Sequence, residues 1–376
     1  MQKIVVMSDS FKGTLSSRSI AALAETVIHE VYPDCQVVGL PVADGGEGTV
    51  SCFHEILGGT LVTETVHGPW GEPLRASYVQ IGSTAVIETA SAAGLPLVGT
   101  RKDPSHTTTF GVGQLMRHAA EHGARKIILG LGGSATNDGG CGAAAALGVK
   151  FYGDDGAEFC PVGATLRHIR RIDISAAAER LRGITVEAMC DIDNPLCGER
   201  GAAAVFAPQK GADASMVEQL EQGLRHLAEL VEADLGVSML NLPGAGAAGG
   251  FGGGATAFFG AALRPGIDVV LDAVSFEARI ADADFIITGE GKLDGQSLGG
   301  KVPIGIARRA KRLNIPLIAI VGVVGEDIRA VYQEGITAVF PTNRTGRPFE
   351  EIASRSAEDY RQTLSDLMHM LHLFVP

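Results

Sequence analysis

The stretch that decides the fold reads TGEGKLDGQSLGGK and covers residues 288–301. The residues before it, ADFII, have the apolar character of a buried strand, and residues 303–313 have the spacing of an amphipathic helix. A glycine-rich loop between a strand and a helix N-terminus is a common phosphate site, because free backbone N–H groups and the helix dipole favour an anion there. The stretch therefore predicts an α/β unit that binds a phosphate-bearing ligand.

The same loop carries charged side chains that suit phosphate chemistry. Glu290 and Asp294 are candidates for holding a metal ion, and Lys301 is a candidate for neutralising phosphate charge. Residues 295–301 nearly spell a P-loop, but Val302 stands where that motif has a serine or threonine for magnesium. The alternative interpretation is a tight turn with solvated charges.

Composition narrows the class of protein. The 376 residues, 45% hydrophobic and 20% charged, are typical of a globular protein of two domains. The formal net charge of −12 argues against nucleic-acid binding, so an anionic ligand would need local lysines, arginines or a metal ion. The six cysteines form no C-x-x-C pair, as expected for reduced thiols in the cytoplasm. The uncharged run over residues 235–263 is rich in glycine and alanine, so we expect no membrane span.

The order of the expected elements indicates a sheet domain made from both ends of the chain. Strands over residues 3–7 and 36–42, each followed by a helix, favour a parallel sheet. Three strands between residues 61 and 89 then follow without long helices between them, which breaks the alternation. Strand–helix alternation returns over residues 283–376.

This change of pattern sets the expected domain boundaries. One domain is discontinuous and covers residues 1–65 and 283–376, and a second α/β domain is inserted as residues 66–282. A cleft between two domains is the default place for a ligand, so we expect the active site there.

Carboxylate pairs follow three of the expected strands. Carboxylates two to four residues apart can hold Mg²⁺, or one of them can act as a base for a hydroxyl. Any single pair is also compatible with a cap or turn residue, but three pairs at strand ends favour one shared site. The pairs are Asp44 with Glu47, Asp191 with Asp193, and Glu290 with Asp294.

The glycine-rich motifs together resemble those of the type 1 glycerate kinase family, the bacterial glycerate 2-kinases. Seven segments match in family order over nearly the full length, which is far more specific than any single glycine motif. Family members often have a proline before the first Asp-Ser and a glycine where Ala207 stands, and neither difference touches a side chain with an expected role. The segments are SDSFKGTLS at 8–16, PVADGGEGT at 41–49, GLGGSATNDGG at 130–140, CDIDNPLCG at 190–198, FAPQKGA at 206–212, PGAGAAGG at 243–250 and TGEGKLDGQSLGGKVPIGIA at 288–307.

The resemblance implies a fold that pairs a flavodoxin-like parallel-sheet domain, built from both chain ends, with an inserted second α/β domain. It also implies ATP-dependent phosphorylation of D-glycerate at the 2-hydroxyl, giving 2-phosphoglycerate and ADP, in glyoxylate, glycolate or sugar-diacid breakdown. ATP and Mg²⁺ are therefore the expected cofactors, and D-glycerate and ATP the expected partners. No nucleic-acid or membrane partner is expected, and homo-oligomerisation stays open.

Residue roles are hypotheses built on what phosphoryl transfer needs, namely an in-line hydroxyl, a metal on the phosphates and nearby positive charge. Glu290 and Asp294 are the expected Mg²⁺ ligands. Either Asp191 or Asp44 is expected to accept the hydroxyl proton, and Lys12 is a further catalytic candidate.

Lysines, hydroxyls and backbone amides in the motifs are expected to hold the two substrates. Either Lys12 or Lys210 is expected to pair with the glycerate carboxylate, although each can also be a solvated lysine. The expected nucleotide-binding residues are Gly289, Gly291, Lys292, Gly300, Lys301, Ser134, Thr136 and Asn137. The expected substrate-binding residues are Ser10, Lys12, Asp44, Gly45, Gly46, Asn194 and Lys210.

Two other functions are kept as alternatives. Gly244, Gly246 and Gly249 spell the G-x-G-x-x-G pattern of an NAD(P)-dependent dehydrogenase of small hydroxy acids, but Pro243 interrupts the strand that this motif needs. A non-catalytic glycerate or nucleotide sensor would need a module that passes on a signal, and neither a DNA-binding module nor a basic tail is seen in the sequence.

Overall fold

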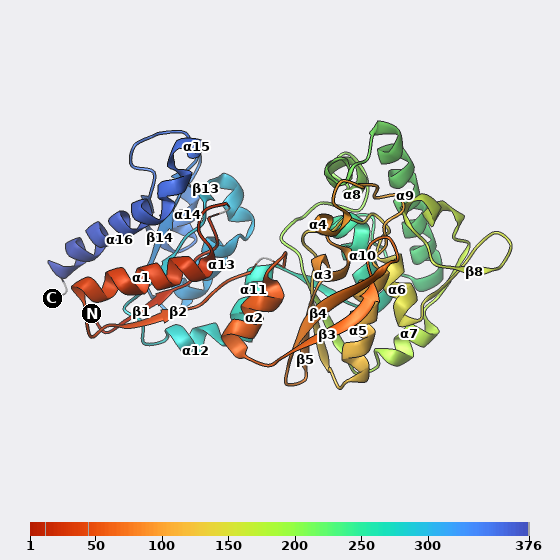
Figure 1. The fold of residues 1–376 in the computed structure, drawn as a ribbon, viewed down its shortest axis with the longest axis horizontal. Helices are drawn as coiled ribbons and strands as arrows, with labels where there is room; N and C mark the ends of the chain where they lie inside the picture. The colour runs from red at the N-terminus through yellow and green to blue at the C-terminus, as the bar shows by residue number, and fades with distance from the viewer. Residues whose placement is uncertain (12, 44, 375–376) are drawn as a thin grey trace. The chain divides into compact units, whose positions relative to one another are not determined.

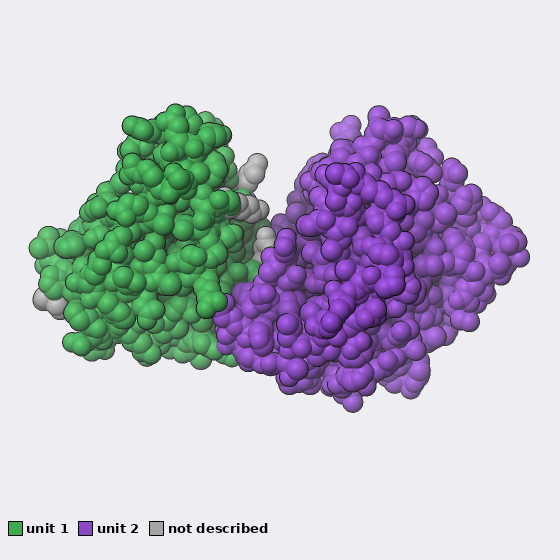
Figure 2. Space-filling view, viewed as in Figure 1, with its two compact units in different colours: residues 1–43, 267–376 green, residues 44–266 purple. Residues whose placement is uncertain are grey.

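A computed structural model describes the chain except for residues 12, 44 and 375–376. It divides into two compact units, shown in green and purple in Figure 2. Unit 1 comprises Met1–Ala43 and Ile267–Pro376, and unit 2 comprises Asp44–Gly266.

These divisions come earlier in the chain than the boundaries expected at residues 65 and 282. Helix α2 (Thr49–Leu57) packs against strands of unit 2, and α12 (Phe276–Ile280) packs against a helix of unit 1. Contacts within the folded chain, which the strand pattern cannot show, therefore place α2 in unit 2 and α12 in unit 1. The expected active site in a cleft between the domains stays a prediction.

Unit 1 contains a five-stranded parallel sheet in the order β16–β14–β12–β1–β2 (Figure 1). Numbered along the chain, this is the 2-1-3-4-5 order of flavodoxin-like sheets, so the expected flavodoxin-like domain is confirmed. The strands are Lys3–Val6 (β1), Gln36–Gly39 (β2), Phe285–Thr288 (β12), Leu317–Val321 (β14) and Ile336–Pro341 (β16).

Helices cover both faces of this sheet. Helices α1 (Ser17–Val31) and α16 (Ser356–His372) lie side by side on one face, where their apolar side chains pack with alternate strand residues (Figure 1). Helix α13 (Val302–Arg312) packs against β12 and β14. Because both faces are buried, the strands read as continuous apolar runs. The shorter elements are α11 (Gly266–Ala273), α14 (Arg329–Gln333), α15 (Phe349–Ile352), β13 (Lys292–Leu293) and β15 (Val323–Val324).

Unit 2 is built on a six-stranded mixed sheet in the order β11–β10–β6–β5–β4–β3. Strands β3, β4 and β5, which are the three strands expected without long helices between them, form antiparallel pairs, and the remaining pairs are parallel. The strands are Thr60–His67 (β3), Pro73–Ile81 (β4), Thr84–Glu88 (β5), Lys126–Gly130 (β6), Thr185–Met189 (β10) and Ala262–Arg264 (β11).

Helices and a small second sheet complete unit 2. The main helices are α5 (Phe110–Glu121), α6 (Cys141–Leu147), α9 (Ala214–Leu235) and α10 (Ala247–Phe259). The shorter elements are α3 (Ala90–Ala93), α4 (Leu95–Val98), α7 (Ser175–Arg180), α8 (Ala202–Phe206), β7 (Lys150–Tyr152), β8 (Glu158–Phe159) and β9 (Arg171–Asp173). Within the described part of the chain, no helix combines the length and apolar character needed to cross a bilayer.

Candidate functional site

Two loops of unit 1 meet where the strand order of its sheet reverses, between β1 and β12. The Asp9 amide donates to the Gly289 carbonyl at 2.9 Å, which ties the loop after β1 to the glycine-rich loop after β12. A side chain at Gly289 would collide with the Ile320 carbonyl oxygen of β14. Ligands of open parallel sheets bind at such reversals, outside the carboxyl ends of the strands. We refer to residues 8–10 and 289–301 as the switch-point loops.

Glu290 is the buried charge of the switch-point loops, with only 5% of its surface exposed. Its Oε1 accepts a hydrogen bond from the Ser297 hydroxyl at 2.7 Å, and Lys301 Nζ lies 4.0 Å from Oε2. Burial raises the pKa of the Glu290 carboxyl, and the negative charges of Asp9 and Asp294 raise it further, while Ser297 and Lys301 lower it. Negative charge is therefore concentrated at this point.

The oxygen donors of the switch-point loops suit a magnesium ion. Asp9, Glu290 and Asp294 supply carboxylates, and Ser297 supplies a hydroxyl, all hard ligands of the kind that Mg²⁺ prefers. Asp294 Oδ2 lies 3.0 Å from Lys292 Nζ. Among the residues that the structure describes, no three His, Cys, Asp or Glu side chains are close enough to hold a metal by themselves. Water and phosphate oxygens usually complete a Mg²⁺ shell, so the donor set still fits.

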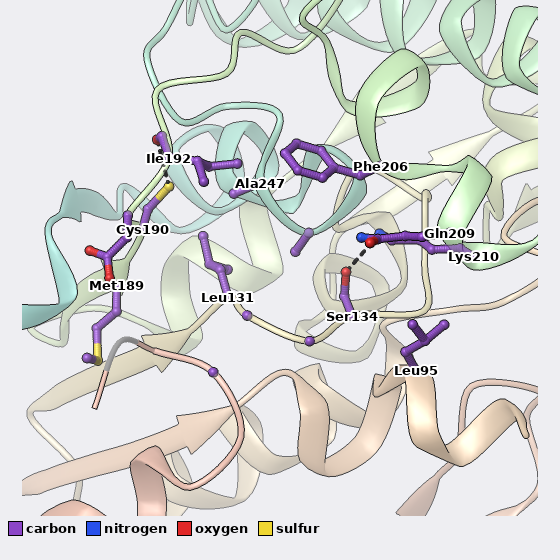
Figure 3. A pocket seen from close by; sticks show the side chains of 15 residues that line it. Leu95, Leu131, Ser134, Met189, Cys190, Ile192, Phe206, Gln209, Lys210 and Ala247 are labelled. Carbon is purple, nitrogen blue, oxygen red and sulfur yellow. Dashed lines mark hydrogen bonds between the residues drawn. The ribbon is translucent and has the colours of Figure 1, made fainter. Parts of the chain in front are cut away.

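Unit 2 contains a cavity of about 300 Å³ at the carboxyl ends of β6 and β10 (Figure 3). Five of the seven sequence motifs contribute to its wall, which places most of the glycine-rich sequence around one space. The loop after β6 reaches the start of the unit, since the Gly132 amide donates to the Gly45 carbonyl at 2.9 Å. The lining residues from these motifs include Gly46, Leu131, Gly132, Ser134, Cys190, Asp191, Phe206, Gln209, Lys210, Ala247 and Ala248.

Lys210 is the buried cation of the unit 2 cavity, with 3% of its surface exposed. Its Nζ donates to Ser134 Oγ at 2.9 Å and to the Thr136 carbonyl at 2.7 Å, and Figure 3 shows the bond to Ser134. Both acceptors are neutral. Burial lowers the pKa of Lys210 to about 7, while the charge of Asp138 acts to raise it. A buried ammonium with neutral acceptors and a neighbouring cavity is suited to receive an anion.

The loop after β6 also carries buried polar groups without partners. Asn137 is fully buried, and neither its Nδ2 nor its Oδ1 has a hydrogen-bond partner within the described chain. Thr136 Oγ1 is also buried without a hydrogen-bond partner among the described residues. Such groups are rare in native proteins and call for a ligand or water. This agrees with the expectation that the loop binds a polar group, although their role stays a prediction.

Three further predicted residues lie in the loop after β10 of unit 2. Asp191 lines the unit 2 cavity, and its Oδ1 accepts a hydrogen bond from the Gly266 amide at 2.7 Å. Its expected companion Asp193 instead forms an exposed ion pair with Arg200 at 2.6 Å. Asn194 Nδ2 donates to the Arg200 carbonyl at 2.7 Å, which holds its own loop.

The remaining candidates fall in the loops at the start of the chain. The Ser10 amide donates to Asp9 Oδ1 at 2.7 Å in the switch-point loops. Gly45 contacts β10, since a side chain there would approach Met189 Cβ to 2.7 Å. Lys12 and Asp44 lie outside the described residues.

Sequence reasoning missed several residues of these sites. Ser297 stands seven positions after Glu290, and no spacing rule links a hydroxyl to a carboxylate at that distance in a loop. Asp138 lies in the segment at 130–140 without an expected role, yet its side chain is fully buried. Ala248 lines the cavity with a left-handed φ of 53°, which an alanine rarely adopts. The described residues 236–246 form loop and turn, so the G-x-G-x-x-G pattern lacks the strand of a dinucleotide site.

The chain is similar to known proteins over almost its whole length. A model of the glycerate kinase family matches residues 4–372. A glycerate kinase of Bacillus subtilis (strain 168) is 44% identical over 374 residues, which cover 99% of this chain and 98% of that protein. The glycerate 2-kinase of Escherichia coli (strain K12) is 46% identical over 341 residues, or 90% of each chain. A protein provisionally named glycerate kinase 2, solved from Salmonella typhimurium LT2, superposes with a TM-score of 0.86 at 43% identity and 98% coverage of both chains.

Proposed function

Since this chain belongs to the glycerate kinase family and is therefore a kinase, we propose that it phosphorylates D-glycerate at the 2-hydroxyl with ATP. The products are 2-phosphoglycerate and ADP. The observation that carries the proposal is the buried Lys210 ammonium at the wall of the unit 2 cavity, because a small carboxylate is the anion it suits. The 46% identity to a glycerate 2-kinase supports the 2-position.

We assign the phosphates of ATP to the switch-point loops. Glu290 and Asp294 would hold Mg²⁺, which when bound offsets negative charge on the transferring phosphoryl group. Lys301 and Lys292 supply positive charge at the same loop. The glycine-rich backbone leaves room for phosphate oxygens to approach the amides of Gly289, Gly291 and Gly300.

We assign the acceptor to the unit 2 cavity. Lys210 pairs with the glycerate carboxylate, and Ser134 holds the ammonium in place. Thr136 and Asn137 remain candidates for binding phosphate oxygens, since their side chains have unfilled hydrogen-bonding capacity among the described residues. Because ATP and free organic acids are cytoplasmic metabolites, a cytoplasmic location belongs to this proposal.

Asp191 is one of two candidates for the base that accepts the hydroxyl proton, and Asp44 is the other. Asp191 lines the same cavity as Lys210, which supports a carboxylate base next to the proposed anion site. Replacing the base with asparagine should lower kcat by about 100-fold or more with little effect on the glycerate KM. If Asp191→Asn and Asp44→Asn both keep near-normal kcat, neither residue is the base.

Phosphorus NMR of the purified protein with Mg-ATP and D-glycerate tests the reaction itself. A 2-phosphoglycerate signal together with ADP is the expected result. A 3-phosphoglycerate signal would keep the kinase but overturn the assigned hydroxyl. Turnover of ATP with another hydroxy acid, and none with D-glycerate, would overturn the assigned substrate.

A further inference from the structure

We propose that Asp138 is a positioning residue of the unit 2 cavity, whose negative charge keeps the Lys210 ammonium in its charged form for the acceptor carboxylate. Both residues are fully or almost fully buried, and neither charge is screened by water. The identity of the acceptor rests on the proposed function. The coupling between the two charges does not, and it can be tested separately.

The surroundings of Asp138 indicate an ionised carboxylate. Its Oδ2 accepts hydrogen bonds from the Thr109 amide and hydroxyl, both at 2.8 Å, and from the Gly142 amide at 3.2 Å. Its Oδ1 accepts from the Gly140 amide at 3.1 Å. Each of these groups donates, so a proton on the carboxyl would face donors instead of acceptors. Burial is the largest effect and raises the pKa of Asp138 above its ordinary value, and these four hydrogen bonds limit that rise.

One short loop connects Asp138 to Lys210. The Thr136 carbonyl, which accepts from Lys210 Nζ, stands two residues before Asp138 in the chain. Thr107, which lies just before α5, donates from its Oγ1 to the Ala135 carbonyl at 2.9 Å. This bond holds the same loop. One loop therefore carries both an acceptor of the Lys210 ammonium and the Asp138 carboxylate.

The other titratable groups near Lys210 do not supply a buried negative charge that would stabilise its ammonium form. Cys190 shares the cavity, but burial raises the pKa of its thiol, which stays neutral. Asp191 also lines the cavity, but it is exposed to solvent, which weakens its effect. Lys102, whose Nζ donates to the Gln209 carbonyl at 3.4 Å, is a cation and acts in the opposite direction. Within the described chain, Asp138 is the buried negative charge that acts on Lys210.

The kinetic test compares Asp138→Asn with Thr107→Val. The first change removes the charge at nearly constant shape, but its amide N–H2 group then faces a donor that the carboxylate accepted from. The second change loosens the same loop without touching either charge. In Asp138→Asn, the pH above which the D-glycerate KM rises should move down by about one unit, so KM at pH 7.5 should rise about tenfold. The kcat at saturating D-glycerate should change little. Thr107→Val should keep the pH profile of the unchanged enzyme, and an equal shift in both variants would overturn the proposal.

Proton uptake gives a readout that a structural role would not move. D-glycerate binding, measured calorimetrically at pH 7.5 in two buffers of different ionisation enthalpy, should take up a fraction of a proton, because the carboxylate draws Lys210 into its charged form. Asp138→Asn should take up a larger fraction, since more of its Lys210 starts neutral. Equal uptake in the two proteins would overturn the proposal.

A double-mutant cycle on thermal stability tests the coupling between the two charges even if Asp138→Asn folds poorly. If the two charges support each other, Asp138→Asn should lower the melting temperature less when Lys210 is already methionine. The double variant Asp138→Asn with Lys210→Met should then fold even if Asp138→Asn alone does not. Additive losses, or failure of both proteins to fold, would show that Asp138 only holds the loop. The cycle needs no substrate, so its outcome is independent of whether D-glycerate is the acceptor.

Discussion

At the scale of single residues, each of the two candidate sites has a buried charged side chain, and the two charges are of opposite sign. Glu290 in the switch-point loops is bonded to Ser297 and acted on by the charges of Asp9 and Asp294, and Lys210 in the unit 2 cavity contacts neutral oxygens. Burying such groups costs folding free energy, and perturbed charges cluster at functional sites. Their chemistry is complementary, because a carboxylate cluster binds a cation and a buried ammonium binds an anion.

The pH dependence of acceptor binding should report Lys210. Because its pKa is about 7, the ammonium loses its proton as the pH rises above that value. The D-glycerate KM should then rise by up to about tenfold for each pH unit above pH 7, while the KM for ATP stays nearly constant. Initial rates between pH 6 and pH 9 measure this. In Lys210→Met, the D-glycerate KM should be high at every pH, and a retained profile there would assign the titration to another group.

The same lowered pKa has a consequence for stability. Between about pH 7 and the ordinary lysine value, the unfolded chain binds more protons at Lys210 than the folded protein does. The free energy of unfolding of the ligand-free protein should therefore gain a contribution that grows with pH across this window and is absent below it.

Glu290→Gln should separate metal binding from folding. Removing the charge relieves repulsion with Asp9 and Asp294, so the melting temperature without Mg²⁺ should rise. Stabilisation by added Mg²⁺ and ADP should fall, and the Mg²⁺ concentration for half-maximal activity should rise about tenfold or more. Glu326→Gln, an exposed carboxylate change in the neighbouring segment, is the matched control. An unchanged Mg²⁺ response in Glu290→Gln would remove Glu290 from the metal site.

At the scale of elements, the loops that follow parallel strands carry the candidate site residues. In unit 1 these are the switch-point loops after β1 and β12, and in unit 2 they follow β6 and β10. Parallel strands end at one edge of a sheet, so motifs far apart in the chain become neighbours there. Helix α1 illustrates the supporting role of the local sequence, since Ser16 Oγ accepts from the Ser19 amide at 3.0 Å and begins the helix.

Two glycines of the loop after β12 should respond differently to alanine. Gly289→Ala would push a methyl group into the Ile320 carbonyl, so it should cost about 2–3 kcal/mol of stability or more and should also abolish activity. Gly299→Ala meets nothing within 4 Å and should leave stability unchanged or raise it by about 0.5 kcal/mol. Urea unfolding of both variants measures the difference. Equal stability of the two variants would mean that the backbone near Ile320 can move away from a methyl group at position 289.

At the scale of the whole molecule, one compact unit is inserted into another. Unit 2 enters and leaves near the end of β10, because Gly45 contacts Met189 and the Gly266 amide bonds to Asp191. Adjacent ends are what an inserted domain needs. Each unit also has its own hydrophobic core, one over residues 66–261 and the other shared by the two ends of the chain.

Residues 45–266 should therefore fold as an isolated fragment. We expect one cooperative thermal transition, a stability on the order of 5 kcal/mol, and no phosphoryl transfer, because the switch-point loops are missing. Circular dichroism and a coupled kinase assay measure both properties. A fragment without a cooperative transition would mean that unit 2 depends on unit 1 for its fold.

Local patterns predicted much of this architecture from the sequence. The expected strands over residues 3–7 and 36–42 match β1 and β2, and the helix expected between them matches α1 (Ser17–Val31). Apolar runs and helix caps are properties of short segments, so they can be recognised without knowing the tertiary structure. The site residues were predicted less completely. Ser297 and Asp138 gain their importance only from partners elsewhere in space.

By itself, the sequence determined the fold class, the seven motifs and the family they resemble, because these depend on short-range patterns and on their order along the chain. Which motifs share a space became clear from the folded structure alone. It grouped five of them around the unit 2 cavity and placed the other two in the switch-point loops. It also showed that Lys210 is buried beside Ser134, a contact across 76 positions of the chain. Burial and long-range contacts depend on tertiary packing, and the spacing of residues along the chain does not reveal that packing.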